Sequence, residues 1–165
     1  MNLTVVNGAI EGFALGAGLI VAIGAQNAYV LRQGLVKQYV LTVTSLCFLS
    51  DALLILAGVA GFGTVVASYP SLISVVTIAG AAFLGVYGLL AFYRALHPGR
   101  LEAGSNGASS LKGAVLTVLA LTWLNPHVYL DTVVMLGGLS GRYEGLARAA
   151  FGIGAAAASF VWFYG

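Results

Sequence analysis

The sequence predicts an all-α protein that is integral to a membrane. Of its 165 residues, 60% are apolar and 7% are charged, and the mean hydropathy is +0.99. Seven Lys/Arg and five Asp/Glu are too few to cover a soluble domain of this size, so the apolar surface must face lipid. The apolar runs are continuous, which favours helices over the alternating strands of a membrane barrel.

Five stretches are long enough to cross the hydrocarbon core of a bilayer, which takes about 20 apolar residues in a helix. They are residues 9–31, 40–61, 71–93, 113–136 and 146–165. Residues 1–8 lack the basic region of a signal peptide, so we expect the first stretch to be kept as a span.

The longest polar connection, residues 94–112, divides the chain into two predicted parts. Residues 1–93 hold three helices and form a first repeat, and residues 113–165 hold the two helices of a second. Loops on the side of residues 94–112 carry more Lys and Arg, so the positive-inside rule places this connection in the cytoplasm and the N-terminus outside. The residues counted are Arg32, Lys37, Arg94, Arg100 and Lys112 on that side, and Arg142 and Arg148 on the other.

Small residues at helical spacing predict that helices approach one another closely. Packing within the chain is the favoured interpretation, and a homo-oligomer stays open as well. The residues are Gly8, Gly12 and Gly16 in the first predicted helix, and Gly152, Ala156 and Ser159 in the last.

The composition excludes several classes of function. A net charge of +2, with no cluster of Lys and Arg among aromatic residues, argues against a nucleic-acid partner. The single cysteine, Cys47, has no partner for a disulfide or a cysteine metal site, and no cofactor is expected. Neither Asp51 nor Asp131 stands in the Gly-x-Gly-Asp signature of an intramembrane aspartyl protease, so an enzyme is not predicted.

Asp51 and Asp131 lie far from the ends of the predicted spans. A charge near the bilayer centre costs about 3 kcal/mol even on insertion scales, so such residues usually face the interior of a bundle or a water-filled cavity. Helical spacing places Asp51 on one face with Thr44, Cys47 and Gly58, opposite leucine-rich faces. The two aspartates therefore predict a transport path, and carboxylates that merely join two helices are the alternative.

Asn125-Pro126 predicts a helix that breaks and restarts at Pro126, because Asn is a good N-cap and Pro a good first helical residue. Free amides at such a restart would suit an anionic group of a substrate, and a simple proline kink is equally open. His127 lies four residues before Asp131 on the same face, so the two side chains can interact, although a packed neutral histidine is the alternative.

A comparable interruption is expected in the first stretch, where Gly24 allows a bend and Gln26 and Asn27 offer caps or cavity ligands. Two interrupted helices, each first in its half of the chain, are typical of inverted-repeat transporters with a site between the halves. The predicted substrate-binding residues are Gly24, Gln26, Asn27, Asp51, Asn125, Pro126, His127 and Asp131.

Four motifs carry a resemblance to a known family: "GAQNAYVLRQG" at 24–34, "LCFLSDALLILAG" at 46–58, "TWLNPHVYLDT" at 122–132 and "ASFVWF" at 158–163. Together they resemble the lysine/arginine exporter branch of the LysE superfamily. The resemblance implies a bacterial inner-membrane exporter of L-arginine or L-lysine, with six helices in two inverted repeats. The chain departs from the family pattern at Ala25, usually a proline, and its end at Gly165 predicts a fragment without the last helix.

The substrate that the resemblance implies matches the charges of the predicted site. A basic amino acid offers a cationic side chain for Asp51 and Asp131 and a carboxylate for the restart at Asn125-Pro126. Moving one positive charge out against an inside-negative potential costs about 2.3 kcal/mol per 100 mV, so we expect exchange with a proton carried by an aspartate. The alternative is a packing or assembly subunit, or an inactive fragment, that transports nothing.

Overall fold

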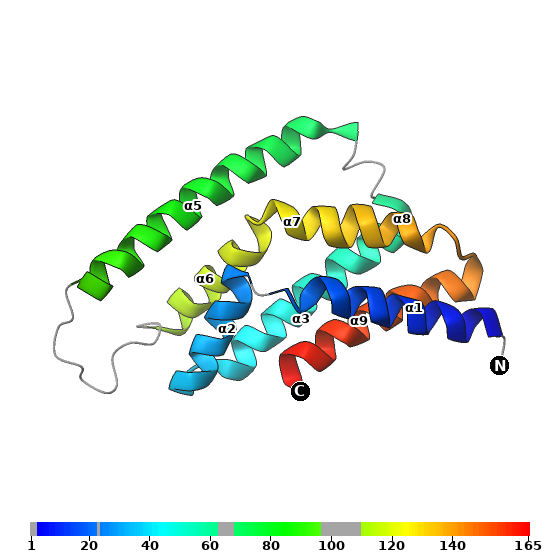
Figure 1. Ribbon diagram of the computed structural model, residues 1–165, viewed down its shortest axis with the longest axis horizontal. Helices are drawn as coiled ribbons and strands as arrows, with labels where there is room; N and C mark the ends of the chain where they lie inside the picture. Colours follow the sequence, from blue (N-terminus) through cyan, green and yellow to red (C-terminus); the bar gives the residue numbers. More distant parts are fainter. Residues whose placement is uncertain (1–2, 23, 63–67, 97–109) are drawn as a thin grey trace.

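The computed structural model describes residues 3–22, 24–62, 68–96 and 110–165, and all regular structure in these residues is helical (Figure 1). This confirms the all-α fold. The first half contains α1 (Leu3–Ile20), α2 (Ala25–Val36), α3 (Val40–Ala57), the π-helical segment η1 (Gly58–Phe62) and α5 (Pro70–Leu96). The second half contains α6 (Leu111–Trp123), α7 (Pro126–Val128), the π-helical segment η2 (Tyr129–Leu136), α8 (Gly137–Ser140) and α9 (Gly145–Tyr164).

Three helices of the described part are long and apolar enough to cross a membrane, namely α1, α9 and α3 with its extension to Gly61. The α6 helix and the helix over Pro126–Ser140 pass the same test together as a pair bent by 59°. The predicted span 71–93 coincides with α5, whose described apolar stretch is Thr77–Leu90. The protein is therefore a multi-pass membrane protein, while the number of five spans stays a prediction.

The helix α3 runs through the middle of the bundle and packs against α9, α6 and η2. α1 and α9 start at the same end and lie side by side, whereas α5 lies along the outer edge and contacts α6 and α7 (Figure 1). Each of the two broken segments, α1–α2 and α6–α7–η2–α8, packs against α3.

Glycine allows the backbones of α1 and α9 to touch. A Cβ atom at Gly12 would lie 2.0 Å from the carbonyl oxygen of Phe151, and one at Gly154 would lie 2.1 Å from that of Ala9. Gly8 and Gly16 meet Ala147 and Ala155 in the same way. The small residues of α1 therefore serve packing within the chain, as favoured from the sequence.

The structure shows which helices the small residues Gly152 and Ser159 contact. Gly152 faces the side chain of Val59, and Ser159 faces Asp51, so this stripe of α9 contacts α3 and η1 rather than α1. The α1 contact instead uses a neighbouring face of α9, one that includes Phe151 and Gly154.

A second close crossing joins the two halves of the chain. A Cβ atom at Gly58 would lie 2.6 Å from the carbonyl oxygen of Thr132, and one at Gly137 would lie 2.6 Å from that of Gly58. This contact holds the end of α3 against η2 and α8. It fixes the helix that carries Asp51 against the segment that carries Asp131.

Candidate functional site

The first helix break lies between α1 and α2 and is closed by Asn27. Its Nδ2 atom donates hydrogen bonds to the carbonyl oxygens of Ile20 (2.9 Å) and Ala22 (2.8 Å), which the end of α1 leaves without helical partners. The Trp162 indole donates to Asn27 Oδ1 over 3.3 Å. Asn27 therefore stabilises the break through both the Nδ2 and the Oδ1 atom of its side chain.

The second break lies between α6 and α7, and its local chemistry is the one predicted. Asn125 is the N-cap, its Oδ1 atom accepts a hydrogen bond from the His127 amide over 3.1 Å, and Pro126 occupies the first helical position. The Tyr129 hydroxyl donates to the carbonyl oxygen of Trp123 over 2.7 Å and ties the restart to the end of α6. The predicted broken helix is confirmed.

The backbone amides at this restart are already used. Pro126 has no amide hydrogen, the His127 amide donates to the Asn125 side chain, and the Val128 amide donates to the Asn125 carbonyl oxygen over 3.2 Å. An anionic group could hydrogen-bond there only by displacing the Asn125 side chain. The restart is therefore a self-capped break, which is neither a simple proline kink nor a restart with free amides, the two interpretations that the sequence left open.

Asn125→Ala is expected to lower the thermal stability of the protein because it removes the cap of the restart. The loss of an Asn N-cap costs about 1 kcal/mol. Thermal unfolding in detergent, followed by circular dichroism, measures the effect. Asn125→Asp keeps the acceptor and should unfold like the wild type, and equal midpoints for all three proteins would show that the cap contributes nothing.

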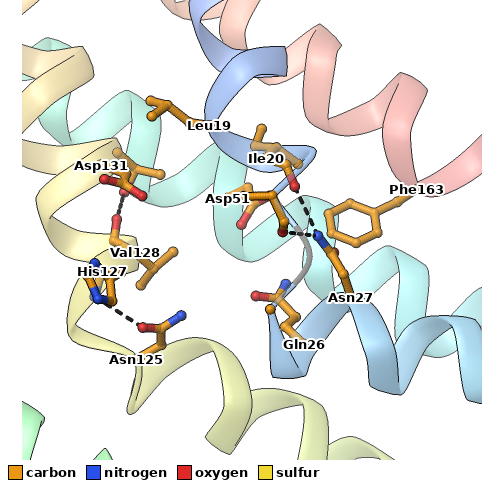
Figure 2. Close-up of a pocket in the computed structure, with 13 residues that line it drawn as sticks. Leu19, Ile20, Gln26, Asn27, Asp51, Asn125, His127, Val128, Asp131 and Phe163 are labelled. Atoms are coloured by element: carbon orange, nitrogen blue, oxygen red, sulfur yellow. Dashed lines mark hydrogen bonds between the residues drawn. The ribbon is translucent and has the colours of Figure 1, made fainter.

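The two breaks face each other across a cavity of about 320 Å³ (Figure 2). Of the eight predicted site residues, seven line it, and Pro126 is not among the lining residues. The predicted ones are Gly24, Gln26, Asn27, Asp51, Asn125, His127 and Asp131, and the sequence missed Leu19, Ile20, Ala22, Val128, Thr132 and Phe163. Two breaks that are 100 residues apart in the chain thus form one site.

Asp51 is the more buried acidic group of the cavity. It is 4% exposed, and the Ser159 hydroxyl donates to its Oδ2 atom over 2.8 Å. It shares a buried face of α3 with Thr44, Cys47 and Gly58, as its helical spacing predicts, while Leu49 and Leu53 are exposed on other faces.

Asp131 lies in the π-helical segment η2 and is half-buried. Figure 2 shows it on the side of the cavity that carries His127, whereas Asp51 lies nearer to Asn27. The Thr132 hydroxyl donates to the carbonyl oxygen of Val128, which supports the wider turn. Short π-helical segments occur frequently at functional sites.

The start of α2 differs from the start of α7. Its N-cap is Gly24, which has no side chain to accept a hydrogen bond from the first turn. Gly24 and Gln26 line the cavity, so the positive end of the α2 dipole faces it. In the sequence, Gly24 predicted a bend in the helix. That it also leaves the start of α2 without a side-chain cap was not predicted.

The charged lining of the cavity is acidic. Asp51 and Asp131 contribute two carboxylates, His127 is a third titratable group, and the described lining includes no Lys or Arg. No group of three or more potential metal-ligating side chains occurs among the described residues. Two carboxylates without a basic residue among the described lining suit a cationic ligand.

A helical multi-pass membrane protein with a polar cavity between two broken helices has the architecture of a transporter. The comparisons with known proteins agree, because the family model described as "LysE type translocator" matches residues 17–165. The chain belongs to the LysE family.

Several relatives resemble the chain over most of its length. The arginine exporter ArgO of Salmonella enteritidis is 45% identical over 159 residues, which cover 94% of this chain and 74% of the relative. ArgO of Klebsiella pneumoniae is 43% identical over the same shares. A Mycobacterium tuberculosis protein named as a candidate amino-acid transporter is 49% identical over 145 residues, 88% of this chain and 72% of the relative. No solved structure matches the chain significantly.

Proposed function

We propose that this protein exports basic amino acids, arginine and/or lysine, across the bacterial inner membrane. The observation that carries the proposal is a membrane cavity that holds two carboxylates, Asp51 and Asp131, with no Lys or Arg in its described lining. Carboxylates in a membrane are costly unless they serve a partner, and a cationic substrate is such a partner. Arginine is also the cargo named for the ArgO relatives.

The charges of the cavity match those of a basic amino acid one by one. Arginine carries an α-ammonium group, a cationic side chain and an α-carboxylate. The cavity offers two carboxylates and the uncapped start of α2 at Gly24. We infer that Asp51, which lies beside the α2 start in Figure 2, binds the α-ammonium group, and that Asp131 binds the side-chain cation. The α-carboxylate then lies at the α2 N-terminus.

Export of such a cation requires a source of energy. An inside-negative potential opposes the exit of one positive charge by about 2.3 kcal/mol per 100 mV. If Asp51 or Asp131 accepts a proton when the substrate leaves, the return of the protonated site cancels the net charge moved. Proton exchange is therefore the proposed coupling. It works with the proposed orientation, in which the loop after α2 faces the cytoplasm.

The experiment is arginine efflux from cells that lack their own arginine exporter. Cells producing this chain are expected to resist the toxic analogue canavanine and to release preloaded radiolabelled arginine faster than cells with an empty vector. Radiolabelled lysine, loaded in the same way, tests the second substrate. A subunit that only packs or assembles would insert in the membrane and leave both efflux rates at the vector level.

A further inference from the structure

The α2 helix buries polar groups that have no partner. Gln33 is 0% exposed, and neither of its amide atoms has a hydrogen-bond partner among the described residues. Tyr29 is 5% exposed, and its hydroxyl likewise lacks one. The side chains of Gln33 and Thr117 are the polar groups close to the Tyr29 hydroxyl, but neither reaches it with the distance and angle of a normal hydrogen bond.

These groups continue the cavity along one face of α2. Gln26, Tyr29 and Gln33 follow one another at spacings of three and four residues, so they share a face of the helix. Gln26 lines the cavity, and Gln33 lies one turn before the end of α2 at Val36. We call Gln26, Tyr29 and Gln33 the α2 stripe. It runs from the cavity to the end of the bundle where α2, α3 and α6 meet (Figure 1).

Packing does not explain this stripe. Tyr29 belongs to a core cluster that also contains the fully buried Val43, Cys47, Ala114 and Val118. An apolar side chain at residue 33, one turn further along the same helix face and fully buried, would continue this core. A buried polar group without a partner destabilises the fold relative to an apolar group of the same shape. Other buried polar side chains nearby do have partners, as the Thr122 hydroxyl does in the carbonyl oxygen of Val118.

We propose that Tyr29 and Gln33 form a second, transient binding site for the transported amino acid, between the cavity and the end of α2. The inference rests on the proposed function. In this structure the packing of α2 on α3 and α6 closes the site. When α2 moves away, the Gln33 amide can donate to the substrate carboxylate and accept from its cationic groups, and the Tyr29 hydroxyl can do either. Uncharged partners bind the amino acid weakly enough to release it onward.

Gln33→Leu and Tyr29→Phe test this assignment. Each is expected to slow arginine efflux at least about tenfold, which corresponds to the loss of one or two useful hydrogen bonds. The thermal midpoint in detergent should stay unchanged or rise, because an unpartnered buried group is removed. Binding of arginine to the cavity, measured by titration calorimetry, should change by less than about threefold.

The outcomes separate this inference from the proposed function. Absence of efflux by the wild type contradicts the proposed function, whereas normal efflux by both variants overturns this inference alone. A lower thermal midpoint for both variants would also overturn this inference. It would show that the Tyr29 and Gln33 side chains stabilise the packing of α2. Ser140→Ala, which alters a buried hydroxyl far from α2, is the matched control and should export normally.

Water access provides an independent measurement. Gln33→Cys in a Cys47→Ala background should react slowly with a polar methanethiosulfonate reagent, because residue 33 is fully buried. Added arginine is expected to increase the reaction rate several-fold, since transport must open the stripe. A rate that arginine leaves unchanged would contradict the opening of this face.

Discussion

Asp51→Asn is expected to abolish arginine export while the protein remains folded in the membrane. The substitution keeps the size of the side chain, and the new amide oxygen can still accept the hydrogen bond of Ser159. It removes the charge that faces the substrate cation, and the loss of one partner of a buried charge pair costs about 2–5 kcal/mol. That range corresponds to a loss of affinity of roughly 30-fold to several thousand-fold.

The measurements are radiolabelled arginine efflux from cells and arginine binding to the purified protein. Asp131→Asn is expected to give the same result, because both carboxylates face the cavity. Glu11→Gln provides a matched control. Glu11 is also an acidic residue of a membrane helix, but it pairs with Tyr143 and Arg142 outside the cavity, so export should persist. Wild-type efflux from both aspartate variants would contradict the proposed site.

Local chemistry made part of the site predictable. Asn125-Pro126 contains a cap and a first helical residue in consecutive positions, so the break is encoded without help from the rest of the chain. Asp51 was predictable for a different reason. A carboxylate in an apolar stretch is expensive wherever it faces lipid, so its burial next to a polar partner follows from its cost alone.

The contacts between distant segments were not predictable in the same way. The pairing of Asp51 with Ser159, and of Asn27 with Trp162, depends on how α9 lies against α2 and α3. A single sequence encodes helix faces but not which faces meet. The use of the restart amides was different, because these bonds are local: an Asn N-cap accepts from an amide of its own first turn, so free amides were not to be expected there.

The close contact of α1 with α9 predicts the largest effect on stability. Gly12→Ala is expected to destabilise the protein, because the added Cβ would lie 2.0 Å from the carbonyl oxygen of Phe151. The oxygen belongs to the backbone and the backbone fixes the position of the Cβ, so no side-chain rotation can relieve the clash. The two helices must separate, and overpacking of this kind costs about 1–3 kcal/mol or more. Thermal unfolding in detergent should show a lower midpoint.

Gly18→Ala is the control in the same helix. No atom lies within 4 Å of the Cβ that it adds, and alanine favours a helix by about 1 kcal/mol over glycine, so its midpoint should equal or exceed that of the wild type. Because α9 carries Phe163 to the cavity and holds Asp51 through Ser159, a displaced α9 should weaken arginine binding in Gly12→Ala. Equal midpoints for the two variants would mean that α1 and α9 do not meet through their backbones.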